Sequence, residues 1–363
     1  MFSFLKRRPN MADSIRREVI GLTANLMEID DIQLTQDGRV IVVLRVLKDS
    51  PDIEPRRQQI EYVVSKLKGI QKAMVILTGD KRPTPPPVHP ATKPPADNQN
   101  LPPVIIAVAS GKGGVGKSTV AVNLALAMSA LGKKVGILDA DIYGPSLPRL
   151  LGVQTSKAEQ GYDGRLEPIS AYGLKAMSMG FLVNEETAMI WRGPMVQSAL
   201  LQMLRDVNWD GLDILVIDMP PGTGDIHLTL AQRVPLSGGV VVSTPQDIAL
   251  IDARKGLEMF KKVAVPILGI VENMSTFCCP NCGHTEAIFG TGGARAEAEK
   301  LGVPCLGEIP LHKKIRELSD AGTPVVAIEP DSPQAQEFKS IAEKVLAGLS
   351  VAARPAPTIR MEE

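Results

Sequence analysis

The sequence has little of several features that mark other classes of protein. Only four cysteines occur among 363 residues, and aromatic side chains make up 4% of the chain. Basic and acidic residues balance at 40 each, so no overall field favours nucleic acid or an anionic membrane as a partner. No apolar run reaches the roughly 20 residues that span a bilayer. We therefore expect neither a disulfide framework nor a membrane span.

The two ends of the chain carry few signals. Residues 1–8 lack the apolar stretch of a secretory signal, so we expect a cytoplasmic protein, with Met11 as an alternative start to Met1. Residues 351–363 contain two prolines and end in Glu-Glu, which predicts a tail and not a basic membrane helix.

Composition divides the remaining chain into three parts. Residues 12–80 alternate helical and strand patterns and predict a small α/β domain. Residues 81–103 contain nine prolines, which predicts an extended linker in preference to a ligand for a proline-reading module. Residues 104–350 alternate apolar strands with amphipathic helices, which predicts an α/β domain with a mostly parallel sheet flanked by helices.

The strongest motif is G-x-x-x-x-G-K-S at residues 111–118, which stands between an apolar strand pattern and a helical pattern. Its glycines let backbone amides approach a triphosphate, and the helix offers its positive end. Lys117 supplies a charge for the β- and γ-phosphates, and the Ser118 hydroxyl suits Mg²⁺. The predicted nucleotide-binding residues are Gly111, Lys112, Gly113, Gly114, Val115, Gly116, Lys117, Ser118 and Thr119.

Two further strands end in carboxylates. One reaches Asp139 and is followed by Asp141, and the other ends at Asp218 and is followed by Gly222. Carboxyl ends of parallel strands line the ligand crevice, so these acids are expected to face Mg²⁺ and the γ-phosphate. Asp218 suits a Walker-B position near Mg²⁺, and the Gly222 amide can approach the γ-phosphate. A helix N-cap is the alternative role for Asp141.

A second candidate site lies at residues 278–284. Cys279 and Cys282 can hold one soft metal, but they supply only two of four ligands. Cys278 and His284 would complete a zinc knuckle within one chain. Alternatively, the same pair on a second subunit would complete a four-thiolate site across a two-fold axis. Spacing leaves both arrangements open.

Four motifs in this order resemble the Mrp/ApbC family of iron–sulfur cluster carriers, P-loop ATPases of the MinD/ParA/nitrogenase-iron-protein class. They are G-K-G-G-V-G-K-S at 111–118, D-A-D-I-Y-G-P-S at 139–146, P-P-G-T-G-D at 220–225 and C-P-N-C at 279–282. The resemblance covers about residues 103–350. It implies ATP, Mg²⁺ and a [4Fe–4S] cluster as ligands, and a homodimer that passes the cluster to apo iron–sulfur proteins.

The resemblance also assigns roles to single residues. Lys112 would contact phosphates across the dimer interface, Asp141 would orient the attacking water, and Asp139 would support Mg²⁺ through water. Asn273, just past an expected strand at 267–271, occupies the place where the class reads adenine. The predicted catalytic residues are Lys112, Lys117 and Asp141, and the predicted ligands of the cluster are Cys279 and Cys282, whereas Cys278 receives no role.

Residues 12–80 resemble the small iron–sulfur assembly domain that is often fused ahead of Mrp-type ATPases. The loop near residues 50–53 lacks the cysteine that this domain often carries, so we expect it to dock other proteins such as cluster scaffolds. In the insertion at 153–196, Trp191 and Arg192 are expected either to line a dimer or client surface or to fill the core.

Two other functions would use the same nucleotide motifs. A ParA/MinD-type spatial organiser acts on DNA or membrane, but the balanced charge and the tail at 351–363 offer neither a basic face nor a basic amphipathic helix. A zinc-stabilised ATPase scaffold without cluster traffic is the second alternative, and metal analysis separates it from a carrier.

Overall fold

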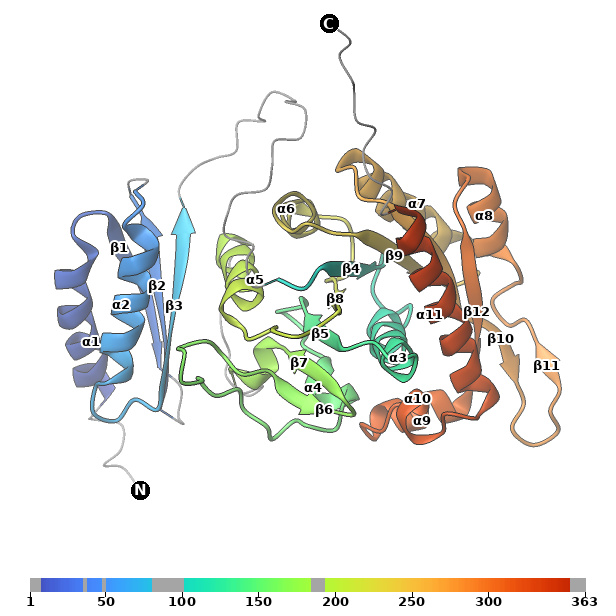
Figure 1. Cartoon of the computed structure of the whole chain (residues 1–363), viewed down its shortest axis with the longest axis horizontal. Helices are drawn as coiled ribbons and strands as arrows, with labels where there is room; N and C mark the ends of the chain where they lie inside the picture. Colours follow the sequence, from blue (N-terminus) through green and yellow to red (C-terminus); the bar gives the residue numbers. More distant parts are fainter. Residues whose placement is uncertain (1–7, 35–37, 48–49, 80–100, 184–192, 353–363) are drawn as a thin grey trace, which may run out of the picture. The chain divides into compact units, whose positions relative to one another are not determined.

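The computed structural model describes residues 8–34, 38–47, 50–79, 101–183 and 193–352. The chain divides into two compact units, one formed by residues 1–93 with 183–202 and the other by residues 94–182 with 203–363 (Figure 1). Trp191, Arg192, most of the expected linker and most of the expected tail lie outside the described residues, so what the sequence predicts for them stays a prediction.

The first unit contains a three-stranded sheet with two helices. Its elements are α1 (Arg8–Thr23), β1 (Met27–Leu34), β2 (Arg39–Val46), α2 (Ile53–Ser65) and β3 (Lys72–Gly79). Strand β2 pairs antiparallel with β1, its immediate neighbour in the chain. It pairs parallel with β3, because α2 crosses over between these two strands.

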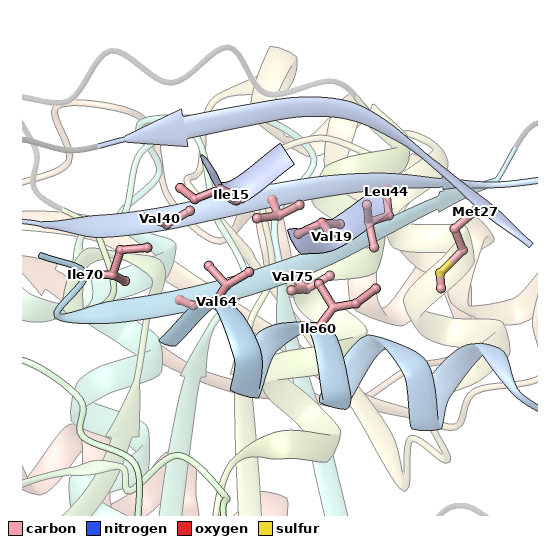
Figure 2. Close-up of a cluster of buried hydrophobic side chains, with 11 residues drawn as sticks. Ile15, Val19, Met27, Val40, Leu44, Ile60, Val64, Ile70 and Val75 are labelled. Atoms are coloured by element: carbon pink, nitrogen blue, oxygen red, sulfur yellow. The ribbon is translucent and has the colours of Figure 1, made fainter. Parts of the chain in front are cut away.

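The core of this unit lies between its sheet and its helices (Figure 2). Val40, Val42 and Leu44 alternate along β2 and share one buried cluster with Ile60 and Val64 of α2. Each of these side chains is at most 1% exposed. Burying one such aliphatic side chain stabilises a fold by about 1.5–3 kcal/mol, so the alternation in β2 and the helical spacing in α2 account for this packing.

The second unit is built on a nine-stranded sheet with the order β11-β10-β9-β4-β8-β5-β7-β6, and β12 pairs with β10. The pairs β10–β11 and β6–β7 are antiparallel, and the other pairs of this sheet are parallel. The strands are β4 (Val104–Ala109), β5 (Val135–Asp139), β6 (Ile169–Ala171), β7 (Leu174–Met177), β8 (Ile214–Asp218), β9 (Gly238–Ser243), β10 (Ile267–Cys278), β11 (Thr285–Glu286) and β12 (Cys305–Leu311). The predicted mostly parallel sheet is confirmed.

The remaining helices follow from the chain order. They are α3 (Lys117–Ala130), α4 (Leu147–Leu150), the short 3₁₀ turn η1 (Met179–Phe181), α5 (Gly193–Asp206), α6 (Asp225–Arg233), α7 (Asp247–Lys262), α8 (Gly293–Leu301), α9 (Lys313–Asp320), α10 (Val325–Ile328) and α11 (Pro333–Ala352). Helix α3 is apolar nearly all round because it packs against both the sheet and α11. Among the described helices, none combines the length and apolar character needed to cross a bilayer.

One strand differs clearly from the sequence-based expectation. The expected strand at 267–271 extends to Cys278 as β10, so Asn273 lies within the strand and not just past it. The extension pairs with β12 on one side, and its end pairs with the two-residue strand β11. These partners lie further along the chain, and local sequence therefore does not reveal where β10 ends.

Candidate functional site

The phosphate loop (residues 110–116) connects β4 to α3. Gly114 and Gly116 adopt left-handed backbone angles, with φ of 81° and 79°. The Ser110 hydroxyl donates to the Lys112 carbonyl oxygen at 2.9 Å and braces the turn. A Cβ at Gly111 would lie 2.1 Å from the Asp252 backbone, so only glycine fits this approach to α7. The loop therefore wraps the N-terminus of α3, as an anion-binding loop requires.

A cavity of about 270 Å³ lies at this loop. It brings together the three predicted catalytic residues, Lys112, Lys117 and Asp141. Its lining also includes Ser110, Gly113, Gly114, Gly116, Ser118, Thr119, Ser146, Leu150 and Pro221. The other predicted nucleotide-binding residues lie around the cavity without lining it: Gly111, Val115, Asp139, Asp218, Gly222 and Asn273.

Lys117 is the buried cation of the site. Its Nζ lies 2.5 Å from Oδ1 of Asp218 and 3.1 Å from the Ser118 hydroxyl oxygen. The lysine is 7% exposed and the aspartate 1% exposed, so this ion pair is largely shielded from solvent. A charged ammonium held at the first residue of α3 can stabilise phosphate oxygens that enter the cavity.

Asp139 and Asp218 stand side by side, because β5 and β8 pair in parallel with these two residues in register. Burial, and then the Asp218 charge, raise the pKa of Asp139 to about 7. Its carboxylate accepts hydrogen bonds from the Asp141, Ser146 and Leu147 amides at 3.0–3.1 Å. The Ser178 hydroxyl also donates to it, at 3.1 Å. Asp139 thus fixes the loop that carries Asp141.

Asp141 lines the cavity and is half-buried. Burial raises the pKa of its carboxyl, and its Oδ1 accepts from the Gly144 amide at 3.3 Å. That hydrogen bond closes a turn within the loop, whereas the predicted N-cap alternative has no support, since the carboxylate bonds no amide of α4 in the described hydrogen bonds. The position suits a group that orients water near a phosphate.

The donor set fits Mg²⁺. Two buried carboxylates, Asp139 and Asp218, share one neighbouring cation, Lys117, and their repulsion contributes to the raised pKa of Asp139. A divalent cation near Asp218 and the Ser118 hydroxyl would balance this charge with oxygen ligands, which Mg²⁺ prefers.

The loop after β8 is fixed to the phosphate loop by its backbone. The Met219 amide donates to the Val108 carbonyl at 2.9 Å, and the Gly222 amide donates to the Ser110 carbonyl at 3.0 Å. Gly222 has a φ of 95°, which explains why glycine stands there. The Gly222 amide lies beside the phosphate loop as predicted, although its donor is engaged by Ser110.

One functional candidate that sequence reasoning missed is His227 on α6. It is 2% exposed, and its Nε2 lies 2.8 Å from the Pro220 carbonyl oxygen. Burial lowers the pKa of His227, so the ring is neutral near pH 7 and Nε2 carries the donated proton. The only sequence signal was a histidine in the first turn of a helix that follows the acid-tipped strand.

Asn273 of β10 contacts the phosphate loop. Its Nδ2 donates to the Val115 carbonyl oxygen at 2.8 Å, and the side chain is buried. A Cβ on Gly116 would lie 2.2 Å from this Nδ2, so the glycine is needed for the contact. Its predicted contact with adenine stays a prediction.

The cysteine hairpin (residues 277–286) forms where β10 turns into β11. Cys278 pairs with Thr285 in the ladder, the Cys279 amide donates to the His284 carbonyl at 2.8 Å, and the Gly283 amide donates to the Cys279 carbonyl at 2.9 Å. Cys282 is exposed and Cys279 half-exposed.

The two predicted thiol ligands lie close together in this turn. Amides of Asn281 and Cys282, followed by the Cys282 side chain, lower the pKa of Cys279 by hydrogen bonding to its sulfur. Across the described ranges, no group of three or more His, Cys, Asp or Glu side chains is placed to hold a metal ion. The in-chain zinc knuckle with Cys278 and His284 is therefore not formed.

These features agree with comparisons to known proteins. A ParA family model described as the NUBPL iron-transfer P-loop NTPase matches residues 103–346. The chain belongs to this family. An iron–sulfur cluster carrier protein of Haemophilus influenzae is 61% identical over 241 residues, which are 66% of this chain and 65% of that protein. The chain thus spans slightly less than two thirds of that relative's length.

A second relative of the NUBPL-type chain is the iron–sulfur cluster transfer protein NUBPL of Dictyostelium discoideum, with 53% identity over 250 residues, 68% of this chain and 77% of that protein. A nucleotide-binding protein of Archaeoglobus fulgidus, solved with ADP, is 41% identical with a TM-score of 0.57, covering 65% of this chain and 91% of that one. The cell division ATPase MinD of Pyrococcus furiosus, at 24% identity and a TM-score of 0.50, covers 67% of this chain and 98% of that one and shares the fold. The predicted P-loop NTPase fold and the resemblance to the carrier family are confirmed.

Proposed function

We propose that this protein is an ATP-dependent carrier that holds a labile [4Fe–4S] cluster between two subunits and delivers it to apo-proteins. The observation that carries the proposal is the exposed pair Cys279 and Cys282, joined by no third metal ligand within the described ranges. One chain then offers two of the four thiolates that such a cluster takes, and a second copy offers the other two. The names of the relatives support a cluster as the cargo.

The nucleotide site supplies the switch. Lys117 and Lys112 stabilise negative charge on the transferring phosphoryl group of ATP, with Lys112 acting across the dimer. Asp141 orients the attacking water from the cavity wall, and Asp139 holds the loop that carries it. Bound Mg²⁺, held near Ser118 and Asp218, neutralises charge on the phosphate oxygens. Asn273 would add a contact to adenine from β10.

The partners follow from this cargo. The protein acts as a homodimer, receives clusters from scaffold proteins and passes them to apo iron–sulfur proteins, while the small domain at residues 12–80 docks other proteins. Free thiols need a reducing compartment, so we place the protein in the cytoplasm. Balanced charge gives no reason to add nucleic acid or membrane to the partners.

Anaerobic reconstitution tests the proposal. The wild-type protein should take up about four iron and four sulfide per dimer, show the broad visible absorption of a cluster, and transfer it to an apo [4Fe–4S] protein. Cys279→Ala should abolish uptake, whereas Cys305→Ala, which changes a half-buried thiol outside the hairpin, should leave it intact. Lys117→Ala should retain uptake and lose ATP-dependent transfer.

Three results would reject the carrier function. They are zinc in place of iron after anaerobic purification, a cluster that stays bound to Cys279→Ala, and transfer that continues at the wild-type rate in Lys117→Ala. Measurement of mass by light scattering during reconstitution adds a fourth criterion, because a cluster bound to a monomer would contradict the bridged site.

A further inference from the structure

Two consecutive residues of β10 contact the same glycine of the phosphate loop. A Cβ on Gly116 would lie 2.2 Å from Nδ2 of Asn273 and 3.6 Å from Cε of Met274. Consecutive side chains of a regular strand point to opposite faces of the sheet, so an ordinary strand could not present both to one neighbour. The backbone of β10 must therefore depart from regular geometry at this point.

The departure is at Met274, whose φ is 57°. The pairing between β10 and β12 also shifts register between Asn273 and Phe277. A non-glycine residue in left-handed geometry costs roughly 1–2 kcal/mol, and it persists only where surrounding contacts hold it. Here those contacts include the phosphate loop itself, through Gly116 and the hydrogen bond of Asn273 to Val115.

The strand leads from this kink directly to the cysteine hairpin. Five residues separate Met274 from Cys279, about 16 Å of extended chain. On the other side of the kink, buried Glu272 accepts a hydrogen bond from the Ala294 amide at 2.6 Å, which fixes β10 to the start of α8. A backbone change at Met274 is therefore blocked toward Glu272 and is passed toward the exposed hairpin.

We propose that Met274 is a positioning residue that couples the nucleotide site to the thiol pair. A nucleotide that moves Val115 and Gly116 changes the contacts that hold Met274 in its left-handed geometry, and the change reorients Cys279 and Cys282. The proposal rests on the proposed function for its purpose, since it links the ATP site to the cargo site. The coupling itself is a property of the metal-free chain and can be measured without a cluster.

The test is the rate at which iodoacetamide alkylates each cysteine, followed by mass spectrometry in metal-free, reduced protein. Wild-type protein is compared without nucleotide and with a saturating non-hydrolysable ATP analogue and Mg²⁺. We expect the analogue to change the alkylation rates of Cys279 and Cys282 at least threefold, while half-buried Cys305 serves as the internal reference. Saturation is checked for each variant by measuring its affinity for the analogue.

Met274→Gly removes both the side-chain contact and the left-handed strain, so the response of the two thiols should be lost. Met274→Ala removes the contact but keeps the strained backbone, and it serves as a second variant if the glycine variant folds poorly. Ala264→Gly is the matched control, because Ala264 is also left-handed, with a φ of 56°, but stands at an exposed turn before β10. This control should keep the full response.

Subunit association is followed by light scattering in the same samples, since a second copy could also cover the thiols. Loss of the response in Met274→Gly with association unchanged supports the proposal. A wild-type protein without a response, a Met274→Gly variant that keeps it, or a response lost only together with association would overturn it. Failure of the carrier function would appear separately, as absence of iron from the reconstituted protein.

Discussion

Replacing His227 tests whether the loop after β8 needs a side-chain support to act. The ring donates from Nε2 to the Pro220 carbonyl at 2.8 Å, and the site is almost fully buried. His227→Leu fills a similar volume without a donor and leaves this carbonyl unpaired. His227→Gln keeps an N–H that can reach the same oxygen, so it is the matched control.

The magnitude follows from the hydrogen bond. A buried polar group left without its partner costs about 1–3 kcal/mol. If the loop recovers its position only in the transition state of ATP hydrolysis, the barrier rises by that amount, which lowers the turnover number about 5- to 150-fold. KM for ATP should change little, because Lys117 and the phosphate loop remain in place.

Steady-state hydrolysis with Mg²⁺–ATP, together with thermal unfolding, gives the decisive comparison. We expect a lower turnover number for His227→Leu and near-normal turnover for His227→Gln. A leucine variant with a lower melting temperature and unchanged turnover would show that the histidine only stabilises the fold. Equal loss in both variants would refute the role assigned to the donated proton.

Three further predictions concern single contacts. Gly116→Ala places a methyl group 2.2 Å from the Asn273 amide at a φ of 79°, so calorimetry should show ATP affinity reduced more than tenfold, and an unchanged affinity would contradict the close approach. Because burial beside Asp218 raises the pKa of Asp139 from 3.8 to about 7, the free energy of unfolding without Mg²⁺ should fall by up to roughly 4 kcal/mol between about pH 4 and 7 and then level off. Asp139→Asn should flatten this dependence in urea titrations, and an equal slope would refute the assignment. Ile60→Ala should destabilise the first unit by about 2–5 kcal/mol in denaturant unfolding while ATP affinity stays unchanged; a matching loss of affinity would show that the units depend on each other.

The nucleotide site was largely readable from the sequence because its signals are local. Glycines, a lysine and a serine follow one apolar run, and Asp139 and Asp218 end two others. Parallel pairing then places strand ends at one edge of the sheet, which is a general rule and needs no knowledge of this chain. The structure adds that Asp139 and Asp218 are direct neighbours in register.

Contacts between distant segments could not be read in this way. Asp139 binds the Ser178 hydroxyl from another strand end, so its role in fixing the loop to Asp141 appears only in the structure. The polar residues after Val271 interrupt the apolar run, yet β10 continues because β12 and β11 supply hydrogen-bonding partners. Left-handed geometry at Met274 has no signal either, since methionine shows no preference for it.

The placement of Cys279 and Cys282 in a solvent-facing hairpin has a consequence for the durability of the protein. The turn is closed by backbone hydrogen bonds of Cys279 and not by a metal, and neither thiol helps to fill a hydrophobic core. Gaining or giving up an inorganic guest therefore leaves the folded architecture of each subunit intact. Repeated rounds of filling and emptying are compatible with a long-lived chain, in contrast to small metal-folded domains that collapse when their ion leaves.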